Sequence, residues 1–204
     1  MSRFKSNISN EELALLDKCL FEGNVSVVDS EEQCLQACEY LASQSIVGFD
    51  TETRPSFKAG RSNPVALLQL SSAEQCFLFR LSRMKLCKDV TRILADESIM
   101  KVGVAVRDDI KGLQKLRWFK AGNFVDLQTI APQWGIAEKS LRKLSGIVLQ
   151  RSVSKAQRLS NWEAANLTPA QIKYAATDAW VCLEIYNELL KEIPHDENIS
   201  ETRA

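Results

Sequence analysis

The sequence predicts an α/β protein with a mixed sheet covered by helices. Apolar segments of strand-like composition follow one another between residues 45 and 79, and further strand segments then alternate with helical segments up to residue 193. The chain of 204 residues fits one domain with small additions, and its 45% hydrophobic and 25% charged residues are ordinary for a soluble globular protein. This composition argues against bulk disorder and against a fibrous class.

Helix-start signals and apolar runs define the elements of the first half of the chain. Ser9-Asn10-Glu11-Glu12 and Ser30-Glu31-Glu32-Gln33 both have the form of a capping box, which opens a helix. The strand segments are short apolar runs bounded by turn residues. We predict helices over 10–20, 31–42 and 86–94, and strands over 25–28, 45–52, 65–70 and 75–79.

The second half alternates strands and helices. Residues 150–167 form a polar, basic connection without strong periodicity, a type of segment that is often functional. Thr168 then opens the last helix as its N-cap, with Pro169 at the first helical position, and this helix runs to about Ile193. We predict strands over 100–105 and 123–127, and helices over 108–116, 127–134 and 139–149. The expected organisation is an N-terminal helical segment (1–24), a main domain (25–193) and a polar tail (194–204).

Charge is balanced overall but uneven along the chain. The net charge is zero, yet residues 138–158 contain six basic residues and one acid. A local basic surface matters more to a polyanion than the sum over the chain, so nucleic-acid binding stays open. The alternative is a set of solvated helix faces. The basic residues are Lys139, Arg142, Lys143, Arg151, Lys155 and Arg158.

Cysteine and histidine usage argues against a zinc site and a disulfide framework. Six cysteines include no C-x-x-C pair, and His195 is the one histidine. The start of the chain has no apolar core typical of a signal peptide, and no apolar run approaches the ~20 residues that span a bilayer. We therefore expect reduced, mostly buried thiols in a cytoplasmic protein, with the nucleus as the alternative, and no membrane association.

Two carboxylates stand at the end of the strand over 45–52. Asp50 and Glu52 are two residues apart, and because a strand alternates faces, both point to one side. Anions this close are tolerated when they are solvated or when a cation lies between them. A hard divalent ion such as Mg²⁺ prefers oxygen ligands of this kind. The alternative is an acidic strand end at the surface.

A further carboxylate lies in an unusual place on the last helix. Asp178 belongs to a row that is otherwise mostly apolar, where a carboxylate is costly unless it is paired or bound to a metal. Tyr174, one turn earlier, shares its face. The alternative is a hydrogen bond to a neighbouring backbone group or to an arginine. Asp108 and Asp109 open another helix, where the dipole favours acids, and one of them is in reach of the strand ends.

Three motifs, in order along the chain, carry a family resemblance. They are Phe49-Asp50-Thr51-Glu52, Val102-Gly103-Val104-Ala105-Val106-Arg107-Asp108-Asp109 and Tyr174-Ala175-Ala176-Thr177-Asp178-Ala179. Together they resemble the exonuclease motifs of the DEDD superfamily, tyrosine subclass, which includes ribonuclease D and the exonuclease domain of Werner-type helicases. Residues 63–70 and Ser160-Asn161-Trp162 look more like the Werner-type branch. The resemblance covers about residues 25–192, and all five motif positions are filled.

The resemblance implies a ribonuclease H-like fold with a mixed five-stranded sheet flanked by helices. It also implies a 3′–5′ exonuclease that releases nucleoside 5′-monophosphates one at a time from the 3′ end of DNA or RNA. Four carboxylates would hold two divalent ions, Mg²⁺ or Mn²⁺, and Tyr174 would help to position the attacking water. The four carboxylates are those of Asp50, Glu52, Asp109 and Asp178, with Asp109 rather than Asp108 in register with the second motif.

This chemistry suits the residue types. Two ions about 3.5–4 Å apart activate water and stabilise the leaving oxygen of a phosphodiester. A tyrosine is neutral at pH 7, so it is better suited to orient water by a hydrogen bond than to remove a proton. The one histidine lies in the tail, which argues against a histidine base in the site.

Basic and aromatic residues in two loops are candidates for contacts with substrate. Arg54, Lys58 and Arg61 follow the first acids, and Lys155 and Arg158 precede the last helix; both groups are placed to contact phosphates, or are simply solvated. Trp162 and Phe57 are candidates for stacking on a base, with core packing as the alternative for both.

Two other functions remain as hypotheses. The chain can be a catalytically retired nucleic-acid-binding module of the same fold, which nothing in the sequence favours because the acid set is complete. It can also be a carboxylate-metal phosphatase acting on small nucleotides. The sequence does not decide between DNA and RNA, and it identifies no protein partner.

Overall fold

The computed structural model describes residues 3–56 and 63–194. The candidate residues Phe57, Lys58 and Arg61 lie outside these ranges, as does most of the predicted polar tail.

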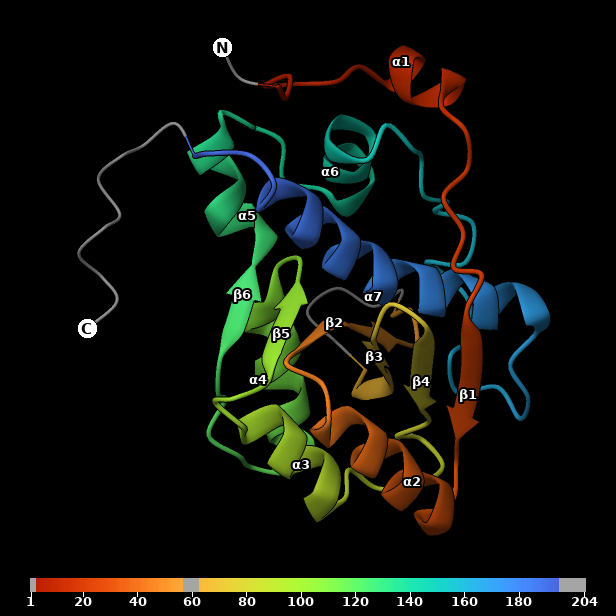
Figure 1. Ribbon diagram of the computed structural model, residues 1–204. Helices are drawn as coiled ribbons and strands as arrows, with labels where there is room; N and C mark the ends of the chain where they lie inside the picture. Colours follow the sequence, from red (N-terminus) through yellow and green to blue (C-terminus); the bar gives the residue numbers. More distant parts are fainter. Residues whose placement is uncertain (1–2, 57–62, 195–204) are drawn as a thin grey trace.

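The described part of the chain forms one mixed sheet of six strands in the order β1-β4-β3-β2-β5-β6 (Figure 1). Pairing is antiparallel between β2 and β3 and between β3 and β4, and parallel elsewhere. The strands are β1 (Asn24–Val28), β2 (Ile46–Thr53), β3 (Val65–Ser71), β4 (Gln75–Phe79), β5 (Met100–Gly103) and β6 (Phe124–Asp126). The count of five that the family resemblance implies is too low by one, because β1 and β6 both pair with their neighbours. The six strand segments predicted from the sequence itself are all present in this sheet.

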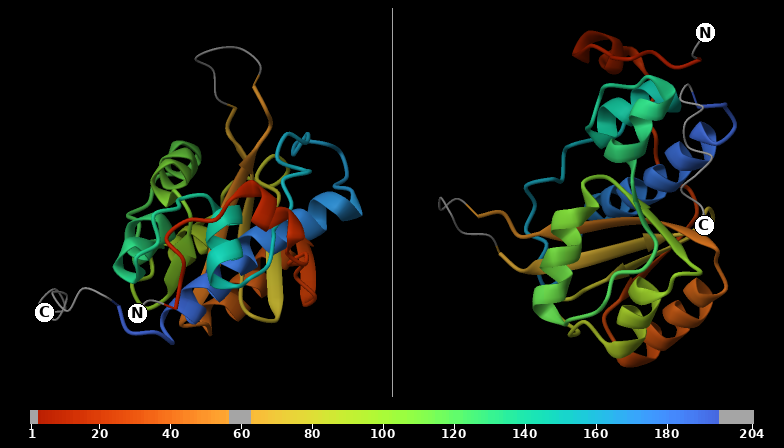
Figure 2. Two further views of the ribbon diagram at one scale, coloured as in Figure 1. Left: turned by 90° about the horizontal axis from the view of Figure 1, so that it is seen from above. Right: turned by 90° about the vertical axis from the view of Figure 1, so that its left-hand side faces the viewer.

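Helices cover both faces of the sheet. The long helix α7 (Pro169–Leu189) crosses one face, and α2 (Glu31–Ala42) and α3 (Lys88–Ala95) pack on the other (Figure 2). The helix α4 (Val106–Leu116) contributes to the same core as α2 and α3. Contact between α7 and β2 is close, since a Cβ built on Gly48 would lie 1.9 Å from the carbonyl oxygen of Ala179. A glycine at this point lets α7 rest directly on the central strand.

A second layer lies outside α7. It contains α1 (Asn10–Leu15), α5 (Leu127–Ile130), the 3₁₀ helix η1 (Ala131–Trp134) and α6 (Leu141–Val148) (Figure 1). Apolar side chains of the N-terminal segment, including Phe4 and Leu13, are buried in the core shared by α6 and α7. No helix in residues 3–56 and 63–194 combines the length and the apolar character needed to cross a membrane.

Capping signals locate helix starts better than apolar patterns locate helix ends. Ser9 forms the capping box that the sequence predicts, and Thr168 is the predicted N-cap of α7. Ser30 caps α2 by accepting a hydrogen bond from the Gln33 amide, without the reciprocal bond of a full capping box. The first helix nevertheless ends at Leu15 rather than near residue 20, because the next segment is extended and pairs with the connection before α7. There the Cys19 amide donates to the Ser152 carbonyl at 3.0 Å. The last helix ends at Leu189, four residues before the predicted end.

Candidate active site

Three carboxylates from distant parts of the chain meet at one point. Asp50 and Glu52 come from the end of β2 and Asp178 from the middle of α7, and one ligand oxygen from each lies within 4.8 Å of the others. The two acids of β2 share a face, as strand alternation predicts. The close approach of α7 at Gly48 places Asp178 over that face. This acidic cluster is compatible with a divalent cation, because hard cations prefer carboxylate oxygens.

Burial and mutual repulsion disfavour the charged form of the cluster. The pKa of Asp50 lies well above its usual range, first because the carboxyl is buried and then because Asp178, Glu52 and Asp109 are close. For the same reasons the pKa of Glu52 is raised to about 8. Burial raises the pKa of Asp178 to about 7. A bound cation would reverse these shifts by favouring the carboxylate form.

Tyr174 lies one helical turn before Asp178 and is hydrogen-bonded to it. This bond lowers the pKa of Asp178 and partly opposes the effect of burial. Burial and the nearby carboxylates raise the pKa of the Tyr174 phenol, which is therefore neutral and able to donate. Its ring packs at 6.0 Å, between centroids, against the ring of Trp162.

Trp162 has no exposed surface, which decides between its two predicted uses. It lies in the core formed by β3, β4 and α7, where it supports the ring of Tyr174. A base has no access to its faces in this arrangement. Trp162 thus acts through Tyr174 rather than as a stacking platform.

Asp109 stands beside the cluster rather than within its compact part. Its carboxylate accepts a hydrogen bond from the hydroxyl of Thr51. Burial raises the pKa of Asp109 to about 6, and the charge of Asp109 in turn raises the pKa of both Asp50 and Glu52. The neighbouring Asp108 is exposed and pairs with Lys111 at 3.1 Å, so of the two acids Asp109 is the one that faces the cluster.

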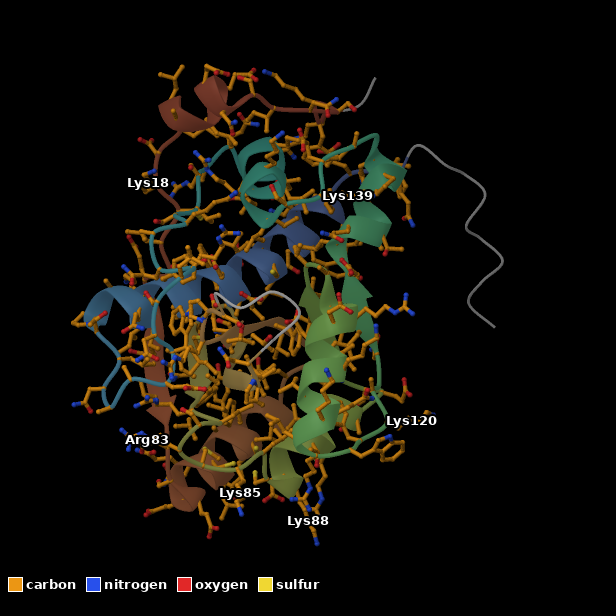
Figure 3. The ribbon with its side chains drawn as sticks, turned by 180° about the vertical axis from the view of Figure 1, so that it is seen from behind. Lys18, Arg83, Lys85, Lys88, Lys120 and Lys139 are labelled. Atoms are coloured by element: carbon orange, nitrogen blue, oxygen red, sulfur yellow. The ribbon has the colours of Figure 1, made fainter. Side chains whose placement is uncertain are left out.

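The candidate substrate-binding cations differ in their surroundings. Arg158 is close enough to the cluster for its charge to lower the pKa of Glu52. Lys155 is exposed. Arg54 forms an ion pair with Glu163 at 3.3 Å, which links the loop after β2 to the connection before α7. Figure 3 shows Lys139, from the basic stretch over 138–158, well separated from Lys120, which follows α4.

A groove of about 530 Å³ opens beside Asp109. It runs between the end of β2, the start of β3 and the exposed side of α4. Thr51 and Asn63 line it on one side, and Lys111 and Lys115 supply positive charge on the other. The groove therefore approaches the carboxylates from the α4 side.

Two residues of the site escaped the sequence analysis. Thr51 donates a hydrogen bond to Asp109, and its position between the two acids of the first motif was the sequence feature that could have indicated a role in the site. Gln69 lies opposite Asp50 in the β2–β3 register and is fully buried, and its amide has no hydrogen-bond partner among the described residues. Its signal was a polar residue in the middle of an apolar strand.

Comparison with known proteins agrees with this geometry. A model described as 3′-5′ exonuclease matches residues 25–194. The chain belongs to the 3′-5′ exonuclease family. The family resemblance inferred from the three motifs is confirmed.

The relatives of this 3′-5′ exonuclease family member are longer proteins. Exonuclease 3′-5′ domain-containing protein 2 of Drosophila melanogaster is 39% identical over 152 residues, which cover 72% of this chain and 26% of that protein. The bifunctional 3′-5′ exonuclease/ATP-dependent helicase WRN of Mus musculus is 33% identical over 210 residues, or 93% of this chain and 15% of that protein. The chain thus spans well under half the length of these relatives.

Solved structures share the fold of this family member. The Nibbler EXO domain of Aedes aegypti superposes with a TM-score of 0.75 at 24% identity, covering 82% of this chain and 87% of that one. Escherichia coli RNase D superposes with a TM-score of 0.74 at 22% identity, covering 82% of this chain and 44% of that one. The ribonuclease H-like α/β fold class is confirmed.

Proposed function

We propose that this chain is a metal-dependent 3′–5′ exonuclease that hydrolyses the terminal phosphodiester of DNA or RNA and releases nucleoside 5′-monophosphates. The observation that carries the proposal is the meeting of Asp50, Glu52 and Asp178 within 4.8 Å, in a chain that belongs to this exonuclease family. Burial and mutual repulsion disfavour the charged state of carboxylates held this close together. A divalent cation is the partner that turns this arrangement into a stable one.

The donor set fits two Mg²⁺ or Mn²⁺ ions. Asp50, Glu52 and Asp178 supply oxygen ligands at one point, and Asp109 adds a fourth carboxylate from α4. Four carboxylates offset the four positive charges of such a pair. When bound, the ions supply an acidified water and shield the negative charge of the phosphate.

The remaining residues act by orientation. Tyr174 is neutral and bonded to Asp178, which places its hydroxyl where it orients a water by a hydrogen bond. Thr51 holds the Asp109 carboxylate toward the site. We assign phosphate contacts to Arg158 and Lys155, with Arg158 the nearer to the cluster, and to Arg54 once it leaves Glu163.

The substrate is proposed to be a nucleic acid. Support comes from the family and from RNase D of Trypanosoma brucei, a protein of the same fold whose crystal structure is a complex with RNA U12. The part of this chain that the structure describes contains no feature that selects RNA over DNA, so both enter the test.

Oligonucleotides labelled at either end test the proposal. We expect stepwise shortening of 5′-labelled strands and early release of the label from 3′-labelled strands, dependent on Mg²⁺ or Mn²⁺ and blocked by a chelator. Asp50→Asn should abolish shortening. Asp108→Asn is the matched control, because this exposed acid pairs with Lys111 instead of facing the cluster.

Three results would contradict the proposal. One is the absence of metal-dependent shortening on both DNA and RNA. Another is binding in a gel without cleavage, unaffected by Mn²⁺, which would indicate the retired module. The third is phosphate release from mononucleotides in place of nucleotide release from polymers, which would indicate a phosphatase.

A further inference from the structure

Three thiols gather between α2 and α3, on the sheet face opposite α7. The sulfur atoms of Cys34 and Cys87 lie 2.9 Å apart, and Cys38, one turn further along α2, also contacts Cys34. All six cysteines are free thiols. Cys34 belongs to the core on the sheet face opposite α7, and Lys88, the neighbour of Cys87, is at the lower edge of Figure 3, whereas α7 crosses the upper half. The proposed exonuclease reaction uses none of these thiols.

Geometry selects one pair among the three thiols. A disulfide needs an S–S distance of about 2.05 Å and Cβ atoms about 3.5–4.5 Å apart. The sulfur atoms of Cys34 and Cys87 approach this distance, and they come from the first turn of α2 and from the residue that precedes α3. Cys34 and Cys38 stand four residues apart on one helix, where Cβ atoms are about 5–6 Å apart, too far for a bond.

The arrangement does not suit a shared metal ion. Within the described residues, the group of potential ligand atoms that is compact enough to hold an ion is the carboxylate cluster. The three thiols are more spread out than that group. The two closest sulfurs, those of Cys34 and Cys87, are instead placed to form a covalent bond with each other.

We propose that Cys34 and Cys87 are a modification site, which forms a reversible disulfide when the protein meets hydrogen peroxide. Cys87 is half-buried and Cys34 is 1% exposed, so the oxidant reaches Cys87 first. Its sulfur attacks one peroxide oxygen, the O–O bond breaks, and hydroxide leaves to become water, which gives a sulfenic acid on Cys87. The sulfur of Cys34 then attacks the sulfur of Cys87, and the sulfenic oxygen leaves as a second water with the proton of Cys34. Two thiols thus lose two electrons and one peroxide yields two waters.

The bond would tie together two helices that lead into the centre of the sheet. The helix α2 precedes β2, which carries Asp50, and α3 precedes β5, the parallel neighbour of β2. A disulfide between residues 34 and 87 closes a loop that includes β2, β3 and β4, which restricts the unfolded chain. We therefore expect a melting temperature several degrees higher and unchanged exonuclease activity, since the compact cluster of Asp50, Glu52 and Asp178 lies on the other face.

Mass spectrometry of the oxidised chain tests the site. After treatment with equimolar peroxide, non-reducing digestion should yield a peptide pair joined through residues 34 and 87, lighter by two hydrogen atoms and separated again by dithiothreitol. Cys34→Ser and Cys87→Ser should each lose both the pair and the rise in melting temperature. Cys38→Ser and the matched control Cys76→Ser, a buried thiol of β4, should keep both.

Three outcomes of the mass spectrometry would contradict the proposed disulfide. No linked peptide at any peroxide dose, a link through Cys38, or accumulation of sulfinic acid on Cys87 without a link would each overturn the proposal. A linked peptide in the chain without any shift in melting temperature would overturn the part that assigns it a stabilising effect.

Discussion

The hydroxyl of Thr51 donates a hydrogen bond to the carboxylate of Asp109, and this contact joins β2 to α4 across 58 residues of sequence. Thr51 stands between Asp50 and Glu52 at the end of β2. Asp50 and Glu52 supply two carboxylates on one face of the strand, and Thr51 holds the carboxylate of Asp109 from the other side. The bond lowers the pKa of Asp109 and so favours its charged form. Thr51 is therefore a positioning residue for the proposed metal site.

Replacing Thr51 should weaken metal binding more than it weakens the fold. Thr51→Val keeps the shape and the strand preference of the side chain but removes the donor. Loss of such a supporting bond typically costs about 10–100-fold in metal affinity or activity, so we expect the Mn²⁺ concentration for half-maximal activity to rise by at least about 10-fold. Titration of activity with Mn²⁺ measures this. Thr51→Ser retains the hydroxyl and should restore the wild-type curve; equal defects in both variants would rule out the hydrogen bond as the cause.

The metal-free protein should lose stability as the pH rises. The folded-state pKa values of Asp109, Asp178 and Glu52 are raised to about 6, 7 and 8, whereas unfolded carboxyl groups titrate near ~4. Groups with a raised folded pKa contribute stability that is fully present below the unfolded value and is lost as the pH rises through the folded values. The melting temperature in chelator should therefore fall between about pH 4 and pH 8.

Added metal should reverse that loss where the carboxylates are charged. Melting curves with and without Mn²⁺ at pH 5.5 and pH 8 provide the measurement, and the stabilisation by Mn²⁺ should be larger at the higher pH. Asp178→Asn removes one buried acid and should raise the melting temperature of the metal-free protein at pH 8. A destabilised Asp178→Asn variant at this pH would contradict the assignment of repulsion within the cluster.

Tyr174 should matter for turnover and little for substrate binding. Tyr174→Phe removes the hydroxyl that bonds Asp178 but keeps the ring that packs on Trp162. We expect kcat to fall by about 10–100-fold, as for other groups that support a metal site, with KM for an oligonucleotide nearly unchanged. Single-turnover rates and melting curves separate the two effects. An unchanged kcat would leave Tyr174 without its proposed role in orienting water.

Arg158 should affect binding in a salt-dependent way. It lies near Glu52, so Arg158→Ala should raise KM for oligonucleotides. The same substitution should reduce the slope of log affinity against log salt by about 0.7 for each single-strand phosphate contact that is lost. Binding measured at several salt concentrations checks this. Lys139→Ala is the matched control, because Lys139 is exposed and lies in the outer layer near α5 and α6. Equal effects of both substitutions would indicate a general charge effect instead of a contact at the site.

Local signals in the sequence determined much of this protein. The capping box at Ser9 and the N-cap at Thr168 form as predicted, and strand alternation alone placed Asp50 and Glu52 on one face. These features depend on residues a few positions apart, whose geometry follows from the backbone. The motif order likewise identified the family, because motif residues and their spacing are properties of the chain itself.

Contacts between distant residues were decided by the tertiary structure. Asp178 reaches the acids of β2 because Gly48 lets α7 rest on that strand, and Arg54 pairs with Glu163, 109 residues away. The first helix stops at Leu15 because the next segment finds a partner at Ser152. The burial of Trp162 and the approach of Cys34 to Cys87 have the same origin. Each depends on which elements pack together, and packing is set by the whole core, so no local window of the sequence contains that information.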